Sequence, residues 1–112
     1  MKVKFFQTAR GTYPVRDFID GLEKITQAKV AKYKVAKYIE LLINYGPYLG
    51  PPYIKKLQNK LYELRIPGKI AVRILYTVYD NEYYLLHAFK KKSNKTPRNE
   101  LKIALDRLKE II

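Results

Sequence analysis

The sequence contains no cysteine, which excludes disulfide bonds and cysteine-based zinc sites and fits a reducing compartment. It also has no apolar run that approaches the length of a membrane span. The opening stretch, MKVKFFQ, is too short and too soon interrupted by charge for a secretion signal. We therefore expect a cytoplasmic protein without a membrane segment.

Several motifs of catalysis are absent as well. The chain has no HExxH, P-loop, GxGxxG or GxSxG motif, and its single histidine and scattered carboxylates form no metal-ligand pattern. We therefore expect neither a metal ion nor a small-molecule cofactor. Some reactions need neither a metal ion nor a cofactor. In RNA cleavage, for example, the 2′-hydroxyl can attack the adjacent phosphate. One group must accept its proton, another must protonate the leaving oxygen, and cations must stabilise the added charge.

Positive charge dominates what is present. The 112 residues include 23 Lys and Arg but only 10 Asp and Glu, which gives a net charge of +13. Such an excess repels itself in a compact chain, and a polyanion or acidic protein as the usual partner explains it. A charge that serves only solubility is the alternative. The length predicts one domain over residues 1–112, and 47% apolar residues suffice for its core.

The sequence of the first half of the chain predicts one strand and two helices. A strand is expected at 2–8, and a short helix at 15–24 begins after Pro14. Apolar residues at steps of three and four predict an amphipathic helix at 26–45, which ends at Gly46-Pro47. The short connection between the helices predicts a helical hairpin.

After a loop at 46–53 the apolar period changes to two, which predicts strands at 61–66, 70–79 and 82–90. A type II turn at Pro67-Gly68 and a tight turn at Asp80-Asn81 would make these strands an antiparallel meander. A last helix begins at Thr96-Pro97, with Thr96 as a possible cap. The order predicts an α+β fold with a four-stranded sheet, in which the first strand lies beside the meander.

Two arginines stand on adjacent predicted strands. Arg65 shares a strand face with Glu63, and the turn at 67–68 brings Arg73 alongside. Two permanently charged guanidinium groups on one face would form a clamp for a phosphate. The alternative is that Arg65 pairs with Glu63 or another carboxylate at the surface, and the residues alone leave both open.

His87 is the only histidine, and its ordinary pKa near neutrality suits a proton shuttle. The alternative is a structural histidine, half buried between Leu86 and Phe89. The densest basic cluster follows it, and a lysine pair precedes the meander. Either could be solvated charge or part of a basic surface on one side of the sheet. The lysines of these clusters are Lys55, Lys56, Lys90, Lys91, Lys92 and Lys95.

Seven segments occur in an order that is more specific than any one of them. They are PVRDF (14–18), YGPYLG (45–50), PYIKKL (52–57), LYELRI (61–66), RILY (73–76), LLHAFKKK (85–92) and KTP (95–97). Together they resemble the phage-derived HigB-like toxins of the RelE/ParE superfamily over nearly the whole chain. Ala88 departs from the glycine that many relatives have after the histidine.

The resemblance implies a RelE-like fold and an endoribonuclease that cuts mRNA on translating ribosomes. It also implies neutralisation by a helix-turn-helix antitoxin. By carry-over, Arg65 and Arg73 would bind the scissile phosphate, and Lys55 would assist as base or electrostatic partner. His87 would be the general acid. The RNA-binding positions would be Lys56, Lys90, Lys91, Lys92 and Lys95. ParE-type members share the fold but inhibit DNA gyrase, so a gyrase inhibitor and a non-catalytic RNA-binding module remain alternatives.

Overall fold

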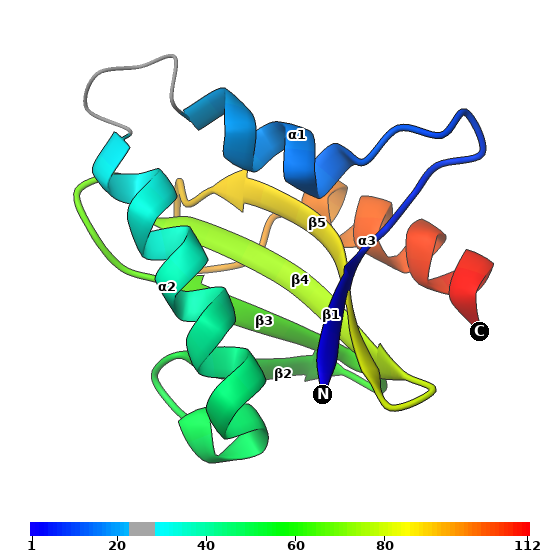
Figure 1. Ribbon diagram of the computed structural model, residues 1–112. Coiled ribbons are helices and arrows are strands. Elements are labelled where there is room, and N and C mark those ends of the chain that lie inside the picture. The colour runs from blue at the N-terminus through cyan, green and yellow to red at the C-terminus, as the bar shows by residue number, and fades with distance from the viewer. Residues whose placement is uncertain (23–28) are drawn as a thin grey trace.

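A computed structural model of the chain describes residues 1–22 and 29–112 and has the predicted α+β architecture (Figure 1). The predicted end of the first helix at Lys24 and the predicted start of the second at Thr26 lie outside the described residues. The elements are β1 (Lys2–Phe5), α1 (Pro14–Gly21), α2 (Lys29–Tyr45), the short 3-10 helix η3 (Gly46–Leu49), β2 (Ile54–Gln58), β3 (Leu61–Ile66), β4 (Val72–Tyr79), β5 (Glu82–Lys90) and α3 (Arg98–Ile111).

The sheet has five strands in the order β1-β5-β4-β3-β2, so the prediction of four strands was wrong by one. The additional strand, β2, pairs antiparallel with β3 at the edge of the sheet. Its two adjacent lysines interrupt the alternation of apolar and polar residues from which a strand is predicted. Lysine is nevertheless typical of edge strands, because it discourages pairing with other chains. β1 lies beside the meander as predicted, parallel to β5 at the other edge.

The two faces of the sheet are covered by different helices. α1 and α2 pack on one face, and α3 packs on the other (Figure 1). Alternate residues of each strand therefore enter two separate cores. Leu64 and Ile74 face α1 and α2, whereas Leu61 and Leu75 face α3, and all four are fully buried.

The connections between strands agree only in part with the predicted turns. Asp80 and Asn81 both have positive φ, 50° and 60°, as a tight hairpin of the mirror-image type requires. β4 begins at Val72, two residues later than predicted, so residues 67–71 form a loop longer than a type II turn. α2 ends at Tyr45, and Gly46 follows with φ of 52°, in agreement with the predicted stop.

Candidate anion-binding site

The arginine pair lies on the face of the sheet that α3 covers. Arg65 of β3 and Arg73 of β4 are direct partners in the antiparallel ladder, so both side chains project to the same side. The row next to them holds Glu63 of β3 and Leu75 of β4. Because side chains alternate along a strand, Glu63 and Arg65 share this face. The predicted convergence of the two guanidinium groups is therefore present.

The predicted alternative, pairing with Glu63, is present too. Arg65 Nε donates to Glu63 Oε1 at 2.9 Å, and Arg73 Nη1 donates to the same oxygen at 2.8 Å. The side chain of Glu63 is 0% exposed and that of Arg73 is 7% exposed, whereas Arg65 keeps 29% of its side chain in solvent. One carboxylate between two guanidinium groups leaves a net positive charge. Each guanidinium has five N–H donors, and the bond to Glu63 takes one of them.

Glu63 also ties the sheet to the start of α3. The hydroxyl of Thr96 donates to Glu63 Oε2 at 2.7 Å, across 33 residues of sequence. The prediction that Thr96 caps α3 was wrong: Pro97 is the N-cap residue, and no side chain caps this helix end. The Thr96 hydroxyl serves the buried carboxylate instead, since such a carboxylate stays stable only when hydrogen bonds satisfy its oxygens.

A pocket of about 230 Å³ opens beside the two arginines. It is smaller than sites for drug-sized ligands, which begin near 300 Å³, and its basic residues fit one small anionic group. Lys91 adds a third cation, placed by a hydrogen bond from its backbone N–H to the carbonyl of Ala71. The lining residues are Pro52, Tyr53, Arg65, Ile66, Pro67, Ala71, Arg73 and Lys91.

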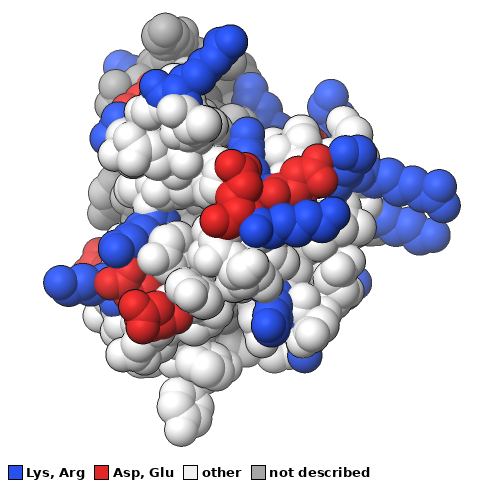
Figure 2. Space-filling model, turned by 90° about the vertical axis from the view of Figure 1, so that its right-hand side faces the viewer, with Lys and Arg blue, Asp and Glu red and all other residues white. Residues whose placement is uncertain are grey.

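Two segments of the chain, which include the strands that form the pocket, carry most of its surplus of positive charge. Residues 46–79 and 90–99, which include β2 to β4 and the loop before α3, hold eleven of the 23 Lys and Arg residues. They hold only one of the ten acidic residues, the buried Glu63. By contrast, the face drawn in Figure 2 carries acidic and basic side chains next to one another. The surplus of positive charge is therefore local, which is how a polyanion-binding surface is built.

The lysine pair before the meander is divided between the two faces. Lys55 pairs with Glu63 in the ladder and so belongs to the face of the arginines, where its side chain is exposed. Lys56 pairs with Tyr62 and lines a different pocket, of about 400 Å³, together with Tyr76 and Tyr83 on the opposite face. The structure therefore brings Lys55, and not Lys56, to the side of the candidate site.

His87 lies on the face of the arginines but is held by α3. Arginine can only donate, so the contact from Arg107 Nη1 to His87 Nδ1 at 3.3 Å makes Nδ1 an acceptor. The ring hydrogen then lies on Nε2, which donates to Glu100 at 3.0 Å. The ring also stacks on Phe89. These contacts favour the structural alternative, and the general-acid role of His87 stays a prediction.

The remaining predicted lysines do not converge on the pocket as Lys91 does. Lys90 lies at the end of β5, opposite Val72, and is exposed. Lys92 and Lys95 are exposed in the loop that leads to α3. They contribute to the charge around the site rather than to its lining.

The role of Glu63 as the group that holds both arginines was not predicted from the sequence. Its signal was available: a carboxylate in a strand, two residues from an apolar position and two from an arginine on the same face.

Among the described residues, no group of three His, Asp or Glu is placed to hold a metal ion. None of the helices in the described ranges is long and apolar enough to cross a membrane.

Comparison with known proteins adds one match. A protein-family model described as "Phage derived protein Gp49-like (DUF891)" matches residues 17–109, which include both arginines, Glu63 and all of β2 to β5. A search of curated proteins found no similar sequence.

Proposed function

The chain belongs to the phage-derived Gp49-like family, and from this premise we propose that it is the toxin of a type II toxin–antitoxin pair, an endoribonuclease that cleaves mRNA on translating ribosomes. The Gp49-like family is related to the RelE and HigB-like toxins. The observation that carries the proposal is the pair of guanidinium groups that Glu63 holds at one pocket.

In this proposal, the exposed part of Arg65 and the side chain of Lys91 bind the phosphate between two nucleotides. Arg73, behind them, adds a positive charge. Its attraction for the phosphate becomes stronger as the phosphate gains negative charge in the transition state. Glu63 is a positioning residue, because it orients both arginines and has no exposed surface of its own.

Two side chains are candidates for the proton transfers. Lys55, on the same face, would act as base or electrostatic partner of the attacking 2′-hydroxyl. His87 could protonate the leaving 5′-oxygen only if its Nε2–H were released from Glu100. A helix-turn-helix antitoxin would neutralise the protein, as the resemblance to HigB-like toxins implies.

Arg65→Ala is the variant that tests the proposal most directly. It leaves the buried Arg73–Glu63 pair intact, so the protein should still fold. Lys2→Ala is the matched control, since it also removes one exposed positive charge but from β1, at the edge of the sheet opposite to β2. Induced expression of the wild type and of Lys2→Ala should stop growth, and Arg65→Ala should relieve the arrest.

Mapping of transcript ends after induction separates the alternatives. The proposal requires new 5′ ends within translated messages, which Arg65→Ala reduces at least tenfold. Intact transcripts together with inhibited gyrase supercoiling would identify a ParE-like toxin. RNA retention that depends steeply on salt, without cleavage in the presence or absence of ribosomes, would identify a binding module.

A further inference from the structure

The solvent side of α2 exposes large aromatic side chains that the proposed RNA site does not use. The inner side of this helix packs on the sheet through Ala31, Val35 and Leu42. On the outer side, Tyr33 is 74% exposed and Tyr45 is 56% exposed. Tyrosines so exposed at both ends of one helix face are typical of protein interfaces, where tyrosine is enriched.

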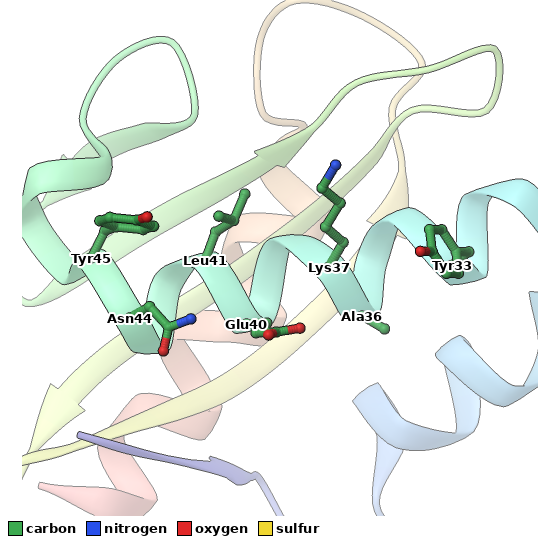
Figure 3. Close-up of a pocket in the computed structure, with 7 residues that line it drawn as sticks. All are labelled: Tyr33, Ala36, Lys37, Glu40, Leu41, Asn44 and Tyr45. Atoms are coloured by element: carbon green, nitrogen blue, oxygen red, sulfur yellow. The ribbon is translucent and has the colours of Figure 1, made fainter.

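A groove of about 390 Å³ runs along this outer side (Figure 3). Its lining consists of two rows of side chains spaced four residues apart. One row is Tyr33, Lys37, Leu41 and Tyr45, and the other is Ala36, Glu40 and Asn44. In Figure 3, Lys37, Leu41 and Tyr45 project from one side of α2, and Ala36, Glu40 and Asn44 project from the other.

Rows at a spacing of four residues are the ridges of an α-helix, and the space between two of them receives a ridge of another helix. Tyr33 and Tyr45 are twelve residues apart, which is about 18 Å along the axis at 1.5 Å per residue. This length matches about three turns of a partner helix. The shape of the groove therefore favours a helix over an extended peptide.

The charges of the groove select the partner further. Lys29, beside the Tyr33 end, and Lys37, within the first row, are cations, and Glu40 is the one carboxylate of the lining. A nucleic acid would bring phosphates along the whole groove, including beside Glu40, which would repel them. A helix can instead place an uncharged residue opposite Glu40 and carboxylates only near Lys29 and Lys37. A second copy of this chain would bring another charge of +13 to the surface.

We propose that the outer face of α2 is a docking site for an amphipathic helix of an acidic partner protein. Apolar side chains of that helix lie between Tyr33 and Tyr45, and its carboxylates pair with Lys29 and Lys37. The proposal goes beyond the RNA site and does not depend on it, because the groove on α2 and the arginine pocket share no lining residue.

A library of helices displayed on a rigid three-helix scaffold tests the docking site with the full-length chain as target. Selected binders should carry apolar residues at steps of three and four, flanked by Asp or Glu. The double variant Tyr33→Ala/Tyr45→Ala should bind them at least tenfold more weakly. Lys37→Glu should weaken binding, and Glu40→Lys should strengthen it.

Tyr48→Ala is the matched control, since Tyr48 is 94% exposed on η3 and lies outside the groove lining. It should leave the affinity unchanged, and melting curves should show that all variants are folded. Binders that recognise the double variant as tightly as the wild type, or that carry no acidic residues, would overturn the proposal. Loss of binding to single-stranded RNA in Tyr33→Ala/Tyr45→Ala would also overturn the proposal, because it would show that the groove binds RNA. Growth arrest by the double variant should equal that of the wild type, whether or not transcripts are cleaved.

Discussion

Arg65 and Arg73 lie directly opposite each other on neighbouring strands, although two cations in that register repel each other. The Glu63 carboxylate resolves the conflict, because one of its oxygens accepts a hydrogen bond from each guanidinium. The same contact that stabilises the sheet also sets the positions of the two arginines at the pocket. Stability and the proposed activity therefore depend on the same buried group.

The two arginines should differ in their effect on stability. Arg73→Ala leaves the fully buried Glu63 with a weaker set of partners, and we expect the free energy of unfolding to fall by about 3–5 kcal/mol. Arg65→Ala removes a partly exposed partner and should cost roughly 1–2 kcal/mol. Urea denaturation measures both values. The double variant Glu63→Gln/Arg73→Ala should lose less stability than the sum of the losses of Glu63→Gln and Arg73→Ala, because it leaves no unpaired buried charge. Equal losses for the two single variants would contradict the asymmetry.

RNA binding should report the number of phosphate contacts through its dependence on salt. Each contact with single-stranded RNA contributes a slope of about 0.7 to the plot of log affinity against log salt concentration. Arg65→Ala should reduce this slope by about that amount, and Lys2→Ala should leave it unchanged. Fluorescence anisotropy with a short RNA at several KCl concentrations measures the slopes. Identical slopes for wild type and Arg65→Ala would remove Arg65 from the proposed site.

His87 should matter more for stability than for cleavage. His87→Gln loses the stacking on Phe89 and the paired contacts with Glu100 and Arg107, so its melting temperature should fall. Its cleavage rate, measured where the protein is folded, should change less than tenfold. A general acid would contribute about 10²- to 10⁴-fold, so a loss of that size would instead establish the catalytic role. Glu100→Gln serves as control, because it alters the same contact and keeps the imidazole.

The close approach of Gly46 to Tyr83 predicts a specific pair of variants. Gly46 has φ of 52°, and a Cβ at this position would lie 2.8 Å from the Tyr83 hydroxyl oxygen. Gly46→Ala should therefore lower the free energy of unfolding by about 1–3 kcal/mol. The double variant Gly46→Ala/Tyr83→Phe should recover the part caused by the hydroxyl but not the part caused by the backbone. If Tyr83→Phe recovers nothing, the clash is not the cause.

Alkaline pH should destabilise the fold through Tyr76. Burial, and to a lesser extent the neighbouring Tyr83 and Tyr62, raise the pKa of the Tyr76 phenol above its ordinary value of 10.0. Above about pH 10 the unfolded chain loses this proton while the folded chain retains it, so stability falls as pH rises. Urea denaturation between pH 8 and 11.5 should show this fall, and Tyr76→Phe should reduce its steepness. An unchanged slope in Tyr76→Phe would assign the effect to other groups.

Local patterns were sufficient for much of the fold. The period of two along β3 to β5, the turn at Asp80-Asn81 and the break at Gly46 follow from backbone geometry, which depends on neighbouring residues only. β2 was not predicted because its lysines are exposed at the edge of the sheet, where apolar and polar side chains need not alternate. That Arg65 and Arg73 share a face depends on the length of the loop between their strands. A two-residue turn at 67–68 would pair Arg65 with Ile70 and put Arg73 on the other face, whereas the loop 67–71 pairs the two arginines directly.

The sequence by itself therefore determined which side chains share a face within each strand, the class of fold and the excess of positive charge. Only the tertiary structure decided what covers each face. Thr96 reaches Glu63 across 33 residues, and Glu100 of α3 contacts His87 of β5. Burial of Glu63 likewise depends on segments far away in the chain. Such contacts arise from the packing of whole elements against one another, and no periodicity in a short stretch of sequence encodes their partners.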